Sequence, residues 1–164
     1  MPDTHIPPAL RDRLAAILGP RGLLTDAADI APHLADWRGL YQGAALAVAR
    51  PATTEEVAAV IRLCAETGTP VVPQGGNTSM VGGATPDETG RHLVLSLQRM
   101  NRLRALDTAD MTMTVDAGMV LKTAQTLAAD AGCLFPLSLG AEGTATIGGV
   151  LSTNAGEEIG RAHV

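Results

Sequence analysis

One run of the sequence limits the fold more than any other, because a strand, a helix and a second strand follow one another between residues 45 and 72. Residues 45–49 form a short apolar run, and Val71 with Val72 forms another. Between them, apolar residues recur three or four positions apart along 57–64, which indicates one buried helix face. Parallel strands need a crossover of about a dozen residues or more, so this run predicts a parallel βαβ unit with a right-handed connection.

The sequence also marks both ends of this central helix. Thr53 can accept a hydrogen bond from the N–H three residues on while Glu56 reaches back, which is the arrangement of a capping box. Gly68 suits the position just after the helix, where the backbone turns left-handed. We therefore expect the helix to lie between Thr53 and Gly68.

Weaker patterns predict the other elements. They are helices at 8–18, 26–34 and 121–128 and strands at 93–97 and 111–115. The stretch 99–103 is interpreted as a connector, and Arg99, Arg102 and Arg104 as solvated side chains around it. Together these elements predict an α+β fold that contains an α/β unit.

Length and composition exclude several classes of protein. The chain has 164 residues and a net charge of −5 without a cluster of Lys and Arg, which argues against a nucleic-acid partner. No stretch approaches ~20 uninterrupted apolar residues, so no membrane span is expected. Cys64 and Cys133 lie far apart, and the N-terminus lacks a secretory pattern, so we expect a cytoplasmic protein. The four histidines are scattered, and no metal site is expected.

Two glycine-rich windows each follow a predicted strand, at residues 73–83 and 136–156. Both mix Gly with Ser, Thr and Asn, and neither contains Lys or Arg. Glycine lets the backbone approach a ligand closely, and successive N–H groups in such a turn form a nest for anionic oxygens. A helix that starts near Thr146 would point further N–H groups at the same place. These loops therefore suit a pyrophosphate that is neutralised by backbone dipoles.

Ordinary turns are the alternative interpretation of these windows, although two such loops after strands favour a ligand. Neither window is a P-loop, because no Gly-Lys-Ser/Thr is present. Neither matches the glycine pattern of a Rossmann site. From the pattern alone, the prediction stops at a dinucleotide or phosphate cradle.

Several motifs occur in an order that is typical of one flavoprotein family. They lie at 50–57, 71–78, 96–97, 100–102, 115–118, 135–140, 147–149 and 152–156, and the most specific are Pro-Gln-Gly-Gly-Asn-Thr and Thr-Asn-Ala-Gly. In these motifs the chain resembles proteins with a PCMH-type (vanillyl-alcohol-oxidase-type) FAD-binding domain. The FAD-linked D-2-hydroxyacid dehydrogenases resemble it most, namely the D-2-hydroxyglutarate, D-lactate and glycolate (oxidase D subunit) enzymes.

The resemblance implies two groups of FAD-contacting residues. Around the pyrophosphate it implies Pro73, Gln74, Gly75, Gly76, Asn77, Thr78, Ser79, Gly82 and Gly83. Along the flavin and ribityl side it implies Pro136, Leu137, Gly140, Gly143, Thr144, Thr146, Gly148, Gly149, Thr153, Asn154 and Gly156. Some members attach the flavin through a His in the first loop, where this chain has 77–79 as Asn-Thr-Ser, so we expect non-covalent FAD.

The resemblance also implies a domain plan and an activity. Residues 1–40 are expected to be a helical arm, 41–157 a PCMH-type domain incomplete at its C-terminus, and 158–164 a non-native tail. Catalytic residues are expected beyond Val164, so this fragment alone is expected to be inactive. The full-length protein is expected to oxidise a D-2-hydroxyacid by hydride transfer to FAD, with an electron acceptor as second partner and a homodimer as a further expectation. The alternatives are a non-catalytic nucleotide-binding α/β domain and a same-fold FAD oxidoreductase for another alcohol.

Overall fold

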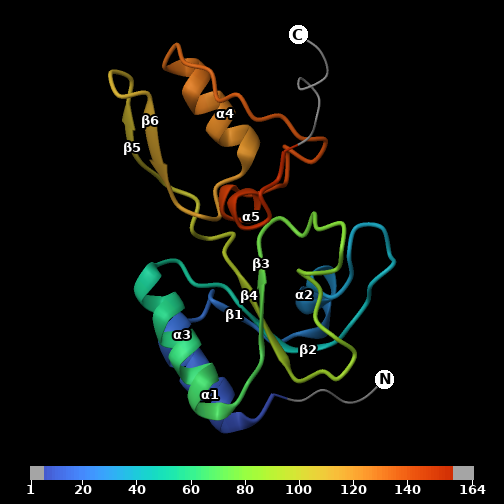
Figure 1. Cartoon of the computed structure of the whole chain (residues 1–164). Coiled ribbons are helices and arrows are strands. Elements are labelled where there is room, and N and C mark those ends of the chain that lie inside the picture. The colour runs from blue at the N-terminus through green and yellow to red at the C-terminus, as the bar shows by residue number, and fades with distance from the viewer. Residues whose placement is uncertain (1–5, 157–164) are drawn as a thin grey trace.

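The computed structural model describes residues 6–156 and divides them into two lobes (Figure 1). The helices are α1 (Pro8–Leu18), α2 (Ala27–Ile30), the 3-10 helix η1 (Ala31–His33), α3 (Thr54–Thr67), α4 (Leu121–Asp130) and α5 (Ile147–Ser152). The strands are β1 (Leu23–Leu24), β2 (Ala45–Ala49), β3 (Val71–Gln74), β4 (His92–Ser96), β5 (Leu103–Asp107) and β6 (Thr112–Val115). We call the part with β1–β4 the sheet lobe and the part with β5, β6, α4 and α5 the hairpin lobe.

The sheet lobe contains the predicted parallel unit, but its two strands are not neighbours. The strand order is β1-β2-β4-β3, and β4 pairs in parallel with both β2 and β3. Strand β4 is therefore central, and 93–96 is buried along its whole length, as is usual for a parallel strand with both faces covered. Strand β1 pairs antiparallel with β2 at the other edge.

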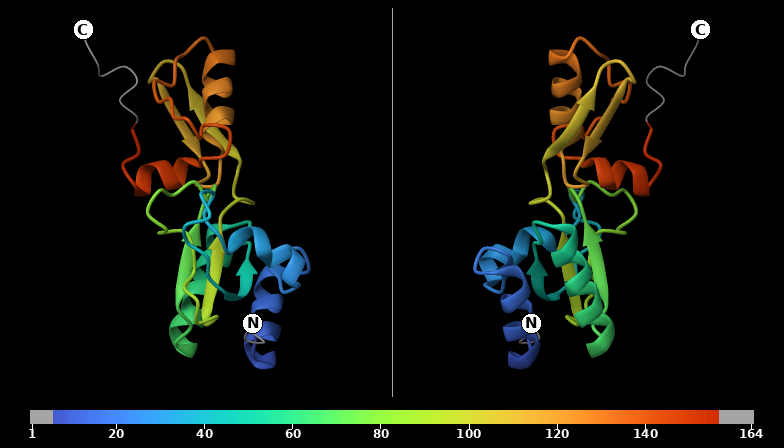
Figure 2. Two further views of the ribbon diagram at one scale, coloured as in Figure 1. Left: turned by 90° about the vertical axis from the view of Figure 1, so that its right-hand side faces the viewer. Right: turned by 90° about the vertical axis from the view of Figure 1, so that its left-hand side faces the viewer.

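Helices cover both faces of this sheet (Figure 2). Helices α1 and α3 pack together on one face, where Leu14, Val60 and Leu93 belong to one buried core. On the other face, Ile30 of α2 packs with Val94 in a second core. Complete burial stabilises each such side chain by about 1.5–3 kcal/mol. The expected N-terminal arm thus packs into the sheet lobe, and its boundary at residue 40 stays a prediction.

The ends of α3 confirm the capping analysis with one shift. Thr53 Oγ1 accepts a hydrogen bond from Glu56 N–H at 3.2 Å. The Glu56 carboxylate reaches one residue further back than expected and accepts from Ala52 N–H at 2.7 Å. Gly68 ends the helix with a left-handed φ of 64°.

Strands β3 and β5 depart most from the sequence prediction. Strand β3 continues through Pro73 to Gln74, because β3 lies at an edge of the sheet, where a missing N–H costs no ladder bond. Strand β5 begins at Leu103, the last residue of the stretch predicted as a connector, and continues to Asp107. Its side chains are mostly exposed, so the apolar alternation that marks a half-buried strand is missing.

The hairpin lobe is built from the antiparallel pair β5–β6 and two helices (Figure 1). Helix α4 was predicted from its apolar face, and Leu121, Ala124 and Ala128 are indeed buried. Helix α5 follows Thr146, as expected, and its Val150 shares a small core with Leu121. This helix lies on the side of the hairpin lobe that faces the sheet lobe, close to the end of β3 (Figure 1).

The predicted tail at 158–164 lies outside the residues that the structure describes. Within residues 6–156, no helix is long and apolar enough to cross a membrane.

Candidate functional site

The first glycine-rich loop (73–83) leaves the sheet at the carboxyl end of β3, the edge where open α/β sheets bind ligands. Gln74 at its start is buried, and its amide is fully used. Nε2 donates to the carbonyls of His33 (3.1 Å) and Ala84 (2.8 Å), and Oε1 lies 2.5 Å from His33 Nδ1. Gln74 therefore holds the loop in place, and no polar atom of its side chain remains for the predicted contact with a ligand.

Asn77 has a left-handed backbone with φ of 54°, which asparagine tolerates better than most residues. Its Nδ2 donates to the Ala35 carbonyl at 2.8 Å and so ties the loop to the N-terminal segment. Its Oδ1 is buried and accepts no hydrogen bond from residues 6–156. An unsatisfied buried acceptor costs about 1–3 kcal/mol, so this oxygen is suited to accept an O–H or N–H from a ligand.

The backbone of the first loop offers a row of donors. Among the residues that the structure describes, none accepts a hydrogen bond from the N–H groups of 75–78. Consecutive N–H groups without a protein partner form the kind of concavity that binds anionic oxygens. This observation agrees with the pyrophosphate nest that the sequence predicts.

At the start of α5, in the second glycine-rich loop (136–156), the N–H donors are already used. Thr146 caps α5, and its Oγ1 accepts from Gly149 N–H at 3.4 Å. The N–H groups of Ile147 and Gly148 donate to carbonyls of the turn at 117–119, at 2.8 and 2.7 Å. The expectation that this helix points free N–H groups at a phosphate is therefore wrong, because its first turn is satisfied from within the protein.

The two loops meet where these backbones come closest. A β carbon on Gly76 would lie 1.9 Å from the Thr144 carbonyl oxygen, and one on Gly75 would lie 2.3 Å from Thr146 Oγ1. A side chain at either position would therefore force its neighbour to move, most of all at Gly76, where that neighbour is backbone. The structure thus brings together four of the predicted residues from two loops that lie far apart in the sequence.

A cation stands beside the first loop, although the loop has none of its own. Arg38 donates from Nη2 to the Met80 carbonyl, and its Nε lies 3.6 Å from the buried Asp36 carboxylate. The pKa of Asp36 lies below its usual value, chiefly because Tyr41 N–H donates to it at 2.8 Å. The Tyr41 ring also covers Gly82, where a β carbon would lie 2.8 Å from it. No motif before residue 44 indicates this support.

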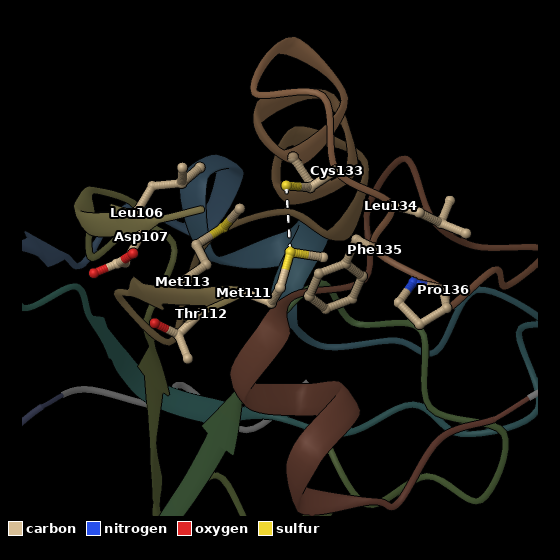
Figure 3. Close-up of a pocket in the computed structure, with 10 residues that line it drawn as sticks. Leu106, Asp107, Met111, Thr112, Met113, Cys133, Leu134, Phe135 and Pro136 are labelled. Atoms are coloured by element: carbon tan, nitrogen blue, oxygen red, sulfur yellow. Dashed lines mark hydrogen bonds between the residues drawn. The ribbon is translucent and has the colours of Figure 1, made fainter. Parts of the chain in front are cut away.

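Other predicted residues are not gathered at this junction. Pro136 lines a pocket of about 240 Å³ in the hairpin lobe, next to Met111, Cys133 and Phe135 (Figure 3). The Leu137 carbonyl accepts from a glutamine of α4. The exposed members of the predicted set are Pro73, Gly83, Pro136, Gly140, Gly143, Thr144, Thr153, Asn154 and Gly156. Their contact with a cofactor stays a prediction.

A buried ion pair behind the junction was also missed. The Asp116 side chain is only 1% exposed, and it accepts from Arg102 Nε at 3.1 Å and from Arg104 Nε at 2.5 Å. Burial opposes ionisation of this carboxyl, but the two arginines outweigh it and lower the pKa of Asp116. Arg102 and Arg104 were expected to be solvated side chains, but both pair with the buried Asp116. Nothing in the sequence around Arg102 and Arg104 or around Asp116 indicates that these side chains meet.

Histidine chemistry is limited in the part of the chain that the structure describes. His92 Nδ1 lies 3.0 Å from Asp87 Oδ1, and His33 contacts Gln74. No group of three or more His, Cys, Asp or Glu in residues 6–156 is arranged to hold a metal ion.

Comparison with known proteins identifies this arrangement. A family model described as "FAD binding domain" matches residues 45–163, which is more than half of the chain. The chain belongs to this family of FAD-binding domains. The match includes both glycine-rich loops and the ion pair behind them.

Curated relatives of the FAD-binding domain match most of it. It is 39% identical over 149 residues to the mitochondrial D-2-hydroxyglutarate dehydrogenase of Bos taurus, covering 88% of this chain and 27% of that protein. It is 39% identical over 134 residues to the D-2-hydroxyglutarate dehydrogenase of Xanthomonas citri pv. viticola, covering 82% and 28%. The chain thus spans about a quarter of the length of the curated relatives it matches.

Solved structures confirm the fold. An alkyldihydroxyacetonephosphate synthase superposes with a TM-score of 0.83 at 21% identity, over 93% of this chain and 30% of that one. A p-cresol methylhydroxylase with bound substrate superposes with a TM-score of 0.72 at 22% identity, over 89% and 28%. The fold is therefore that of a PCMH-type FAD-binding domain, as the resemblance implied.

The residues at the junction fit the cofactor. FAD carries a pyrophosphate that needs donors and ribose and ribityl hydroxyls that can donate. The N–H groups of 75–78 supply donors, and Asn77 Oδ1 is a buried acceptor without a partner.

Proposed function

We propose that the full-length protein containing this domain oxidises a D-2-hydroxyacid to the 2-oxoacid with FAD. The observation that carries the proposal is the identity of 39% to D-2-hydroxyglutarate dehydrogenases, combined with a first loop whose donors are open. When bound, FAD supplies the acceptor for the hydride from the substrate's C2 carbon. Residues of this chain bind and orient the cofactor, and the residues that act on the substrate belong to the remaining three quarters of such a protein.

We assign different roles to the two loops in this binding. The N–H groups of 75–78 bind the pyrophosphate oxygens, and Asn77 Oδ1 accepts from a hydroxyl of the cofactor. The second loop forms the opposite wall, with Thr144 and Thr146 against the first loop. The other predicted contacts of both loops belong to the same proposal, with the exception of the Gln74 side chain.

Titration with FAD tests the binding directly. Hydrogen exchange of the chain is measured with and without FAD, with ADP as a probe for the pyrophosphate alone. We expect the amides of 75–78 to be protected by about tenfold or more, the factor that corresponds to 1.4 kcal/mol, while those of 147–149 change little. Unchanged exchange at 75–78 in an FAD-bound chain would contradict the assigned nest.

A second test concerns attachment of the cofactor. Because the first loop has Asn-Thr-Ser at 77–79, FAD is proposed to be bound without a covalent link. Acid precipitation of the FAD-loaded protein should therefore leave all yellow colour in the supernatant. Colour retained in the pellet would contradict this assignment.

The activity itself is tested on the full-length protein. Reduction of a dye acceptor is measured with D-2-hydroxyglutarate, D-lactate and glycolate, and with the L-isomers as controls. We expect turnover with a D-2-hydroxyacid and the isolated 164-residue chain to be inactive. Turnover with another alcohol alone would favour the same-fold alternative, and a full-length protein that ignores FAD would favour a non-catalytic domain.

The cellular context is a further part of the proposal. A free electron acceptor and a homodimer stay proposals for the full-length protein. The cytoplasmic location also stays a proposal, since the relative from Bos taurus is named as mitochondrial. Fractionation of cells that express the full-length protein checks the location, and size-exclusion chromatography checks the homodimer.

A further inference from the structure

Asp116 lies at the start of a chain of contacts that reaches the first glycine-rich loop. Its carboxylate is held by the backbone N–H of Arg102 at 3.2 Å as well as by Arg102 Nε and Arg104 Nε. Three donors on one buried carboxylate leave it little freedom to move. Because the turn at 116–119 begins with Asp116, holding this carboxylate in place also limits the movement of the turn.

The turn is pressed against the sheet lobe as well. Gly118 N–H donates to the Met100 carbonyl at 2.8 Å, and a β carbon on Gly118 would lie 1.8 Å from the Leu97 carbonyl oxygen. The pKa of Glu55 at the start of α3 is lowered chiefly by its own backbone N–H and the Thr53 hydroxyl, and the charges of Arg104 and Arg102 add a smaller contribution.

The same turn decides where α5 begins. The Ala117 carbonyl accepts from Gly148 N–H, and the Met119 carbonyl accepts from Ile147 N–H. Gly148 approaches so closely that a β carbon on it would lie 2.8 Å from the Ala117 β carbon. Thr146, immediately before α5, then touches Gly75 of the first loop.

We propose that Asp116 is a positioning residue, which together with Arg102 and Arg104 fixes the turn at 116–119 and so holds the second glycine-rich loop against the first. The inference rests on the proposed function, because its purpose is to keep the two walls of the FAD site at a set distance. A buried ion pair contributes little net stability compared with apolar residues of the same size. A positioning role accounts for burying this one at the junction of the lobes.

The test compares local and global opening in the full 164-residue chain. The variants are Asp116→Asn, which keeps the shape but removes the charge, and the double variant Arg102→Gln with Arg104→Gln. Both arginines are about half exposed, so the double variant keeps the inference testable if Asp116→Asn fails to fold. The matched control is Arg13→Gln, which removes an exposed ion pair with Glu66 on the α1–α3 face.

Hydrogen exchange without FAD is the first readout. We expect the amides of Ile147 and Gly148 to exchange at least about tenfold faster in both variants, while those of α3 and β4 keep their rates and the control changes neither. A factor of ten corresponds to about 1.4 kcal/mol of local opening. Equal acceleration throughout the chain would reduce Asp116 to a structural residue, and unchanged exchange at 147–148 would also overturn the inference.

Affinity for FAD is the second readout. The variants should raise the Kd for FAD by about tenfold relative to the wild type and the Arg13→Gln control. Should the wild-type chain not bind FAD, the proposed binding role of this chain fails, while the exchange measurement still decides the positioning role. An unchanged Kd together with faster local exchange would overturn the link between Asp116 and the cofactor.

Discussion

The two glycine-rich loops have similar compositions, but the first loop and the start of α5 in the second use their backbones in opposite ways. In the first loop, the N–H groups of 75–78 have no partner within residues 6–156. In the second, the N–H groups of 147–149 are donated to Thr146 and to the turn at 117–119. In the first loop, Gly75 and Gly76 make room for the second loop beside the open N–H groups, and at the start of α5 Gly148 packs against the turn at 117–119. Similar composition therefore does not indicate similar function.

The substitution expected to have the largest effect is Gly76→Ala, because it acts where the two loops touch. The new β carbon would overlap the Thr144 carbonyl oxygen, so one loop must move. We expect the affinity for FAD to fall by about 100-fold, equivalent to about 2.7 kcal/mol. Fluorescence titration with FAD measures this loss.

Gly83→Ala is the matched control for Gly76→Ala. A β carbon at Gly83 would meet only Ser79 Oγ, at 3.9 Å, which is an ordinary contact. Gly83 is itself a proposed contact, but alanine keeps its backbone N–H, so the affinity for FAD should stay within about twofold of the wild type, less than the 1.4 kcal/mol of a tenfold change. Equal losses in the two variants would mean that the contact between the loops is not what matters.

Gln74→Leu tests whether the first loop is held from behind. The change leaves the carbonyls of His33 and Ala84 without their donor, at a cost of about 1–3 kcal/mol for unsatisfied buried groups. We expect the free energy of unfolding without FAD to fall by about 2 kcal/mol, measured in urea. Gln98→Leu, on an exposed side chain, is the control. A loss of FAD affinity at unchanged stability would instead place Gln74 against the cofactor.

Thr146→Val tests the second loop, where the Thr146 hydroxyl caps the start of α5. Loss of a capping hydroxyl costs about 1 kcal/mol, so stability should fall by that amount. Thr123→Val, on the exposed face of α4, is the control. FAD affinity should fall much less than in Gly76→Ala, and a larger fall at unchanged stability would make this hydroxyl a direct contact.

The smallest expected effect is a pH dependence of the free energy of unfolding that comes from Asp116. Because the pKa of Asp116 is lower in the folded chain than in the unfolded one, its ionised form adds stability above the unfolded value of about 3.9. This contribution is lost as the pH falls through the lower folded pKa. The stability difference between wild type and Asp116→Asn should therefore be constant from pH 5 to 7, taken as roughly one unit or more above that value, and should shrink below it. Urea unfolding at several pH values measures it, and a difference that persists unchanged in acid would contradict the assigned ion pair.

Local sequence signals were sufficient wherever neighbouring residues decide the structure. Thr53, Glu56 and Gly68 marked the ends of α3, and Thr146 marked the start of α5. The glycines at 75 and 76 indicated a close approach of the backbone, although they did not reveal what approaches. The family resemblance extended this to the PCMH-type fold and FAD, which the comparisons confirm.

The misses share one cause, which is that they depend on partners far away in the sequence. Strand β5 lacks apolar alternation because its faces are mostly exposed, so its pairing with β6 leaves no local signal. Gln74 looked like part of a binding loop until His33 was seen to occupy its amide. The arginines around residue 103 looked solvated because Asp116 is brought to them only by the hairpin.

By itself, the amino-acid sequence determined most of the elements, the caps of α3 and α5 and the presence of two loops that could bind an anion. Capping, periodicity and glycine content act over a few residues, and they can be evaluated without knowing the fold. Only the tertiary structure decided that, within residues 6–156, the N–H groups of 75–78 stay open while those of 147–149 are used, because the acceptors are mostly carbonyls that the fold brings from elsewhere in the chain. That distribution of hydrogen bonds supports the proposal that the anion binds in the first loop and that the second loop forms the supporting wall.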